Sequence, residues 1–442
     1  MTHDLDLLDA ADVQRLARLV GEQLADDRIA RTADGRGGLG LADERQLGRR
    51  LVARQLDELA SSRLARGEDP MTVSAENALA DAVLDAVFGL GRIQPLLDDD
   101  EINDIHIRGC EPVRLKMRDG SRRQVAPVVT TDDELVELIR RAAARGGRGE
   151  RRLDAATPEL NLQLPDGSRL FAAIEVTSRP SVIIRRHRFE LSTLDELCDR
   201  GMFDGSVLRF LAAAVAARRN VVISGGTGTG KTTLLRALIN EIPSNERLVT
   251  IEDAYELGID RFADRHPDHD MLQSRPANIE GQGEVTLLDL TRMALRMDPD
   301  RVIIGEVRGG EAFPMLLAMS QGNNGSMCTM HADSTRSVFP KLAAYVSMAD
   351  TGLPVDTVNL LLANALHFVV HIELVDGVRR IVSIREVVDA EGGRIISNEV
   401  FERGTDGVAI ASAPLRDASA LLFEQHGFDT RDHRRREVLG SW

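Results

Sequence analysis

Between residues 205 and 370 the chain alternates short apolar runs with longer amphipathic stretches. The short runs are rich in β-branched residues, which is typical of strands that are buried on both faces. The longer stretches repeat apolar residues at helical spacing; in the one over residues 287–297 they fall on one face, and Asp298–Pro299 ends the helix. This pattern predicts an α/β fold, a parallel sheet covered by helices on both faces. The predicted strands are NVVIS (220–224), RLVTI (247–251), RVIIG (301–305) and SMCTM (326–330).

The flanking regions follow other patterns. Residues 75–192 contain a helix, short strands joined by RDGS and PDGS turns, and a second helix that begins with Thr131 and Glu134 in capping-box spacing. This pattern predicts a separate α+β domain. The charge spacing in residues 1–74 predicts a helical, partly flexible segment. After residue 370, alternating runs joined by tight turns predict an antiparallel meander, which completes, with the tail, a domain over residues 205–442.

Composition and charge narrow the classes of function. The 442 residues carry 55 Lys and Arg against 70 Asp and Glu, a formal charge of −15, and 3% of them are aromatic. Such a chain has no general field that attracts nucleic acid and few rings on which bases stack, so we expect no direct nucleic-acid partner. The longest apolar run, FLAAAVAA, is too short to span a membrane, and three scattered cysteines fit a reducing compartment. We expect a soluble, cytoplasmic protein that reaches a membrane only through partners.

A glycine-rich loop stands between a predicted strand and a predicted helix. Its sequence, GGTGTGKT over residues 225–232, fits the phosphate-binding motif G-x-x-x-x-G-K-[ST] in the context that the motif requires. Glycines let the backbone turn tightly enough to direct successive N–H groups at an anion, at the positive end of the next helix. We therefore expect ATP with Mg²⁺ as ligands, with Lys231 on the β- and γ-phosphates and Thr232 on Mg²⁺. The predicted binding residues are Gly225, Gly226, Thr227, Gly228, Thr229, Gly230, Lys231, Thr232 and Thr233.

Three further strands end in polar residues at the edge of the sheet where this loop would lie. They deliver Glu252 and Asp253, Glu306, and His331. A carboxylate beside a phosphate-binding loop can orient the attacking water or hold Mg²⁺. We expect Glu306 to polarise water, Glu252 to assist with water or metal, and His331 to sense phosphate. The alternatives are an acid that favours a helix start and, for His331, a hydrogen-bonded core histidine.

Four separated stretches together resemble one family. GGTGTGKTT, VTIEDAYEL, DPDRVIIGEVRGGEA and GSMCTMHADS are similar to the phosphate loop, aspartate box, Walker B and histidine box of the type II/type IV secretion ATPases. Within that family these sequences most resemble the tight-adherence (Flp) pilus assembly branch, and the resemblance extends over residues 80–375. Residues 1–70 and 405–442 match nothing in that family.

The resemblance implies a RecA-like P-loop ATPase core, a PAS-like α+β domain before it, and a hexameric ring docked on an inner-membrane platform protein. It also implies that nucleotide lies between the two domains, where Arg185 and Arg169 of the first would reach the phosphates. Strand-edge arginines that face water are the alternative. The expected function is an ATP-hydrolysing motor for pilus assembly or secretion. Two other functions stay open, a RecA-like nucleic-acid translocase and a nucleotide-gated structural subunit that seldom hydrolyses ATP.

Overall fold

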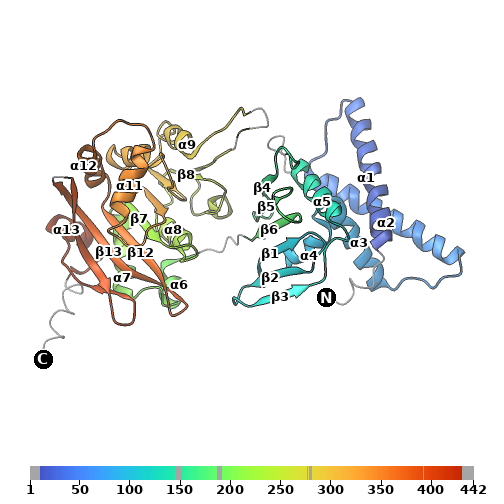
Figure 1. The fold of residues 1–442 in the computed structure, drawn as a ribbon, viewed down its shortest axis with the longest axis horizontal. Coiled ribbons are helices and arrows are strands. Elements are labelled where there is room, and N and C mark those ends of the chain that lie inside the picture. Colours follow the sequence, from blue (N-terminus) through green and yellow to red (C-terminus); the bar gives the residue numbers. More distant parts are fainter. Residues whose placement is uncertain are drawn as a thin grey trace. The chain divides into compact units, whose positions relative to one another are not determined.

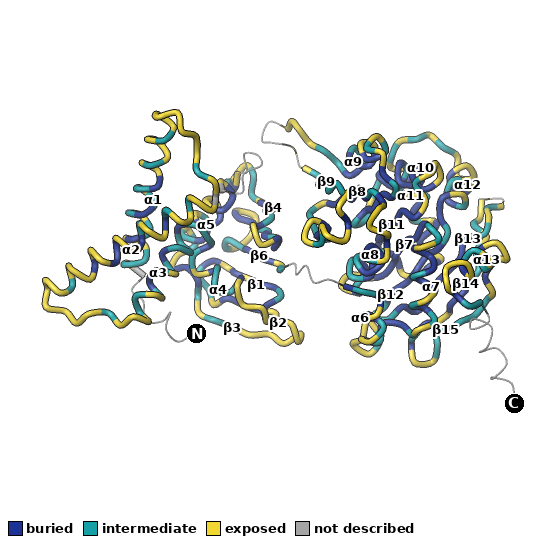
Figure 2. Tube along the Cα trace, turned by 180° about the vertical axis from the view of Figure 1, so that it is seen from behind, coloured by how far each residue is buried: buried dark blue, intermediate teal, exposed yellow. Residues whose placement is uncertain are grey.

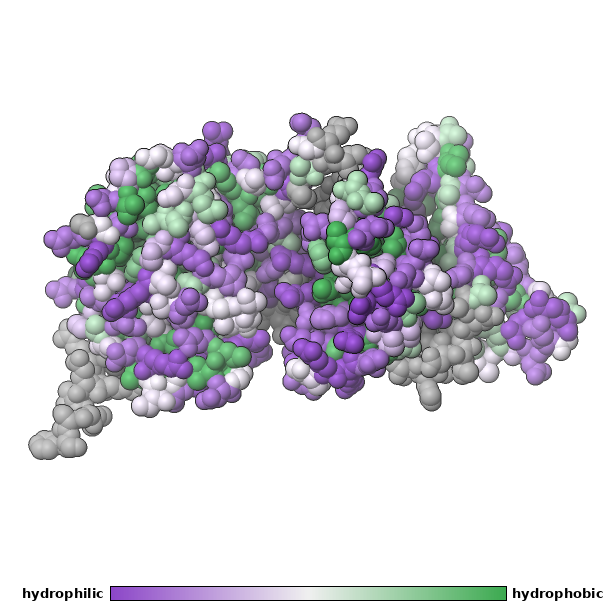
Figure 3. Space-filling model, viewed as in Figure 1, coloured by the Kyte–Doolittle hydropathy of each residue, from purple (hydrophilic) through white to green (hydrophobic). Residues whose placement is uncertain are grey.

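The computed structural model describes residues 10–145, 152–186, 192–275, 277, 281–391 and 393–430. The chain divides into two compact units, Met1–Arg188 and Phe189–Trp442 (Figure 1). Hydrophilic residues cover most of the face seen in Figure 3, and in the described part of the chain no helix is both long enough and apolar enough to cross a membrane.

The first unit begins with three helices, α1 (Ala10–Ala33), α2 (Leu41–Ala65) and α3 (Val73–Phe88). Their apolar side chains, among them Val20, Val52 and Val83, form a small core of their own. The helical character predicted for the start of the chain is thus confirmed from residue 10 onward. In Figure 2 the surfaces of α1 and α2 outside this core are largely exposed.

An antiparallel sheet follows in the first unit. Its strand order is β3-β2-β1-β6-β5-β4, and in β2 (Val113–Met117) alternate residues face the core. Helix α5 packs on the buried face through Leu135 and Ile139, and Thr131 and Glu134 cap its start. The α+β architecture predicted here is confirmed. The elements are η2 (Gly91–Ile93), α4 (Gln94–Asp98), β1 (Ile102–Arg108), β2 (Val113–Met117), β3 (Arg122–Val125), α5 (Asp132–Arg145), β4 (Glu159–Gln163), β5 (Arg169–Ala173) and β6 (Ser181–Arg185).

The second unit is built on a sheet of order β15-β14-β13-β12-β7-β11-β10-β8-β9 among the described residues. The strands from β12 to β9 are parallel, and β13, β14 and β15 form the antiparallel meander. The predicted α/β fold is therefore confirmed. The strands are β7 (Val221–Gly225), β8 (Leu248–Glu252), β9 (His269–Gln273), β10 (Arg301–Ile304), β11 (Met327–Met330), β12 (Phe368–Val375), β13 (Val378–Glu391), β14 (Arg394–Arg403) and β15 (Ala409–Ala411).

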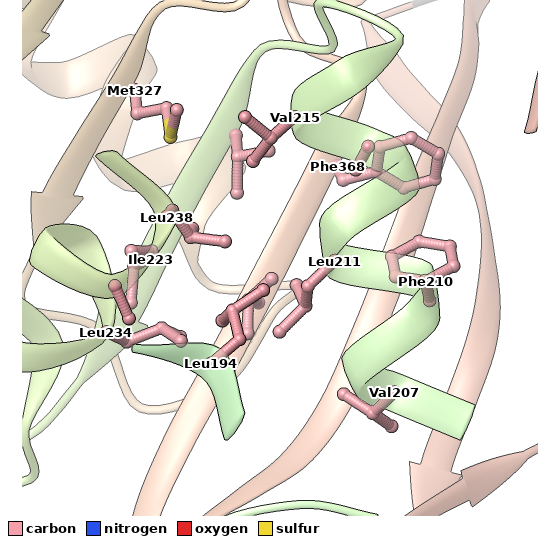
Figure 4. Packing of buried hydrophobic residues seen from close by; sticks show 14 of the residues in the cluster. Leu194, Val207, Phe210, Leu211, Val215, Ile223, Leu234, Leu238, Met327 and Phe368 are labelled. Carbon is pink, nitrogen blue, oxygen red and sulfur yellow. The ribbon is translucent and has the colours of Figure 1, made fainter. Parts of the chain in front are cut away.

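Helices cover both faces of this sheet. Val221 and Ile223 of β7 point into the layer of α6, α7 and α8, whereas Val222 points into the layer of α9 to α12. Figure 4 shows Phe210 and Leu211 of α7 in the first of these layers. Burial on both faces stabilises these strands, and because they are parallel their carboxyl ends lie at one edge of the sheet. The helices are α6 (Leu194–Asp199), α7 (Gly205–Ala216), α8 (Lys231–Asn240), η3 (Ile259–Phe262), α9 (Leu287–Ala294), α10 (Ala312–Ser320), α11 (Val338–Ser347), α12 (Val355–Ala365) and α13 (Asp417–Gln425).

Candidate functional site

The glycine-rich loop connects β7 directly to α8, as its sequence predicts. Gly230 has φ +97°, a conformation that favours glycine. A Cβ atom on Gly225 would lie 2.5 Å from the carbonyl oxygen of Ile372 in β12, so only glycine allows this approach. The loop therefore has the tight backbone path that a bound phosphate needs at the start of a helix.

Lys231, the first residue of α8, is only 7% exposed. Its Nζ donates to the carbonyl oxygens of Gly225 (3.1 Å) and Gly226 (2.8 Å) in its own loop. Burial lowers the pKa of the Lys231 ammonium, while the carboxylates of Glu306 and Glu256 raise it. Because neutral carbonyls are weaker partners for an ammonium than anionic oxygens, the site fits a phosphate. Thr232 and Thr233 are half-buried in the same first turn of the helix.

His331 joins Lys231 to Glu306. Its Nδ1 lies 3.4 Å from Lys231 Nζ, and its Nε2 lies 2.8 Å from Glu306 Oε1. A neutral imidazole with its proton on Nε2 satisfies both contacts, accepting from the lysine and donating to the carboxylate. The side chains of His331 and Glu306 stay 40% and 31% exposed, so both are open to a ligand. The structure thus brings together three residues that the sequence predicted at separate strand ends.

The polar chain continues along the edge of the sheet. Arg308 pairs with Asp253 after β8, and its Nε lies 3.7 Å from Glu306 Oε2. Asp253 in turn accepts a hydrogen bond of 2.8 Å from Ser274, just after β9. Sequence reasoning proposed no role for Arg308, although it stands two residues after Glu306. It gives Glu306 a second partner, on the side away from His331.

Glu252 differs from its neighbours because it is only 3% exposed. Its Oε1 accepts hydrogen bonds from the backbone N–H groups of Glu256 (2.8 Å) and Leu257 (2.9 Å), and its Oε2 is buried without a partner among the described residues. Burial raises the pKa of Glu252 to about 7. In this structure the side chain stabilises the loop after β8, and its predicted role with water or metal stays a prediction.

The end of β7 is also supported from β12. Ser224 Oγ donates to the carbonyl oxygen of Val370 (3.1 Å) and lies 2.9 Å from Nδ1 of the buried His371. Burial lowers the pKa of His371, and the carboxylate of Glu373 opposes this shift. These buried polar contacts fix the strand just before the glycine-rich loop. Only the parallel pairing of β12 with β7, far apart in sequence, brings them together.

Arg185 and Arg169 belong to the first unit and are direct cross-strand partners in β6 and β5. Arg185 is exposed, and its Nε lies 3.3 Å from Oδ1 of Asp104 in β1. Arg169 is half-buried. The two cations therefore stand side by side on one strand pair, and their contact with phosphate stays a prediction.

Known proteins resemble this chain over the stretch that holds the site. A family model described as Type II/IV secretion system protein matches residues 89–403. A protein of Mycobacterium tuberculosis strain H37Rv that is named for conjugal transfer is 35% identical over 314 residues, which are 69% of this chain and 86% of that protein. The Type IV secretion system protein VirB11 of Brucella suis is 31% identical over 317 residues, 64% of this chain and 84% of VirB11.

A third relative shows the same extent of similarity. The Type IV secretion system protein PtlH of Bordetella pertussis is 32% identical over 316 residues, which cover 65% of this chain and 89% of PtlH. The matched stretch of the family model contains every predicted site residue, from Arg169 to His331. The chain therefore belongs to the family of type II/IV secretion system proteins.

Proposed function

We propose that this chain is an ATP-hydrolysing motor that drives a secretion or pilus-assembly apparatus. Its family supports ATPase activity in general and a motor of this kind. The observation that carries the proposal is the run of contacts from Lys231 through His331 to Glu306. A module that only binds nucleotide needs the loop and the lysine, but it does not need a half-exposed carboxylate held beside them.

Each side chain has a defined task in this proposal. The loop amides and Lys231 bind the β- and γ-phosphates, and Lys231 exchanges its two loop carbonyls for phosphate oxygens. Glu306 orients and polarises the attacking water, and His331 fixes the direction of that carboxylate. The Thr232 hydroxyl would hold Mg²⁺, which would neutralise charge that develops on the phosphates. Arg185 and Arg169 add positive charge at the γ-phosphate.

The proposed assembly is a homo-hexamer at the cytoplasmic face of a membrane, docked on an inner-membrane platform protein. The Type IV secretion relatives support work within a larger secretion machine. Within the family we propose the tight-adherence pilus branch, because the sequence of the Walker B region is most similar to that branch. ATP binding and hydrolysis would then move one unit of the chain against the other.

Phosphate release by the purified full chain with ATP and Mg²⁺ tests the proposal. We expect Lys231→Ala and Glu306→Gln each to lower kcat about 100-fold or more, because each removes a group that acts on the transferred phosphate or its water. Glu402→Gln, at an exposed position of β14, is the matched control and should keep full activity. Full activity of Glu306→Gln would contradict the catalytic assignment.

Two further measurements separate the alternatives. Turnover that rises when DNA is added, with binding that weakens steeply as salt rises, would favour a nucleic-acid translocase. ATP that stays intact on the wild-type chain through a single-turnover measurement would favour a nucleotide-gated subunit. We expect turnover of ATP without any effect of DNA.

A further inference from the structure

The hairpin between β12 and β13 reaches past the end of β7. The pairing of β12 with β7 ends at Ile372 and Gly225, and β12 then continues to Val375 before the chain turns back at Val378. The tip of the hairpin therefore lies at the same edge of the sheet as the glycine-rich loop. Arg379, the cross-strand partner of Leu374, stands at this tip.

Arg379 touches the glycine-rich loop from the hairpin. Its Nε donates a hydrogen bond of 3.1 Å to the carbonyl oxygen of Gly228. Its aliphatic stem lies against Gly230, where a Cβ atom would come 3.0 Å from Arg379 Cδ. The backbone N–H of Ile381 donates to the carbonyl oxygen of Met202 (2.8 Å), which holds this end of β13 in place. The guanidinium is thus positioned by the fold beside the residue that precedes Lys231.

The electrostatics of this position favour an anion. The N-terminus of α8 carries partial positive charge, and Lys231 and Arg379 add two cations next to it. Three other arginines of the C-terminal region each pair with a glutamate, Arg385 with Glu399, Arg403 with Glu373 and Arg416 with Glu386. No described carboxylate pairs with Arg379. Such a concentration of positive charge is unfavourable by itself and becomes favourable when an anion enters the loop.

We infer that Arg379 is a nucleotide-binding residue. Its Nε holds the Gly228 carbonyl, and its two Nη groups are left to donate to an anionic oxygen of the nucleotide in the loop. The inference rests on the proposed function, since it assumes that the loop binds a nucleotide, and it assigns to that site a cation from the meander, 151 positions from Gly228 in the sequence. The nucleotide site is then bounded by the β12–β13 hairpin as well as by the strand ends.

The test measures the Kd of the full chain for ADP and for ATP, with binding to a fluorescent ADP analogue as the readout. We expect Arg379→Ala to weaken binding about tenfold, the typical loss for one hydrogen bond to a charged group. Arg379→Lys keeps the charge but loses the fork of donors, so it should recover part of the affinity. In turnover, KM should rise in proportion while kcat stays within about twofold, as expected for a contact made before and during the reaction.

Arg394→Ala is the matched control. Arg394 is an exposed arginine of the same meander, at the start of β14 and so at the opposite end of β13. Its loss should leave the Kd unchanged. Thermal unfolding without nucleotide shows whether each variant is folded. An unchanged Kd in folded Arg379→Ala, or an equal loss in Arg394→Ala, would overturn the inference.

Failure of this inference differs from failure of the proposed function. If ADP binding depends on Arg379 but the wild-type chain hydrolyses no ATP, the motor is refuted and the binding residue stands. If turnover requires Lys231 and Glu306 while Arg379→Ala binds nucleotide like the wild type, the proposed motor function stands and Arg379 is not a nucleotide-binding residue. A wild-type chain that binds neither nucleotide overturns both.

Discussion

The two ends of β10 carry two charged clusters that differ in almost every respect. At the start of the strand, Arg301 is fully buried, donates to both oxygens of Glu246 at 2.8 Å each, and bonds the carbonyl oxygen of Val215. Just past its end, Glu306 is 31% exposed and lies between the guanidinium of Arg308 and the imidazole of His331. One strand thus joins a buried charged cluster to a half-exposed one.

The contrast shows how charge serves stability or chemistry. A buried pair in which each guanidinium nitrogen already has an acceptor is not open to a ligand, and removal of one member leaves the other charge buried with less compensation. A half-exposed carboxylate can exchange a protein partner for a water molecule at small cost. We therefore expect substitutions at the start of β10 to act on folding and those beyond its end to act on turnover.

The largest expected effect follows from Arg301→Ala. Removal of the guanidinium leaves the carboxylate of Glu246 buried, with Arg218 at 3.2 Å as its remaining partner. We expect a loss of about 3–5 kcal/mol in the free energy of unfolding, measured by urea denaturation. Arg394→Ala, an exposed control, should change it by less than about 0.5 kcal/mol. A loss below about 1 kcal/mol for Arg301→Ala would mean that the buried pair does not stabilise this end of the sheet.

The converse holds for Glu306→Gln. Beyond the fall in kcat of about 100-fold already expected, its free energy of unfolding should stay within about 0.5 kcal/mol of the wild type. Urea denaturation and phosphate release on the same preparation check both values. If the variant instead loses several kcal/mol of stability, the two clusters do not differ in the way proposed here.

Glu252 provides a test that depends on pH. Its pKa is raised from 4.5 to about 7, so the folded state holds a proton that the unfolded state releases between these values. Stability therefore falls as pH rises through this window, and the full cost is present above pH 7. Glu252→Gln lacks this dependence, so between pH 5 and pH 8 it should gain roughly 2 kcal/mol relative to the wild type. Urea denaturation of both proteins at the two pH values measures this difference. If the free energy of unfolding changes equally in the wild type and in Glu252→Gln, the pKa of Glu252 is not raised in the folded state.

Arg308→Ala should have the smallest effect. Its ion pairs with Asp253 and Glu306 are half-exposed, and pairs of this kind contribute about 0–1 kcal/mol. We expect a change in kcat of no more than about fivefold, since loss of the pair changes the orientation of Glu306 by little while His331 remains. Arg308→Lys should restore most of the difference. A 100-fold loss would place Arg308 with Glu306 as an essential group.

Much of the second unit was predictable because each of these elements is marked by a pattern in its own residues. The buried parallel strands are visible in the sequence as apolar runs. The glycine-rich loop is recognised by the spacing of its glycines and its lysine in the motif G-x-x-x-x-G-K-[ST]. Strand β9 was missed because His269–Gln273 is only half-buried and pairs at the edge of the sheet, so no apolar run marks it. Helices α6, α7 and α13 and strand β15 were also not assigned, although Phe210 and Phe423 are fully buried.

The site was predictable only in part. Strand ends identified Glu306 and His331, since an α/β sheet brings its carboxyl ends to one edge. The burial of Glu252 depends on how the loop after β8 folds back over it, and the approach of Arg379 depends on the register of a hairpin far along the chain. Neither property follows from the residue types near those positions.

The close approach of Gly225 to Ile372 has a mechanical consequence. Because there is no room for even a methyl group between them, the start of the glycine-rich loop lies directly against the backbone of β12. A shift of the loop at Gly225 would therefore press on the backbone of β12, so we expect the two segments to move together.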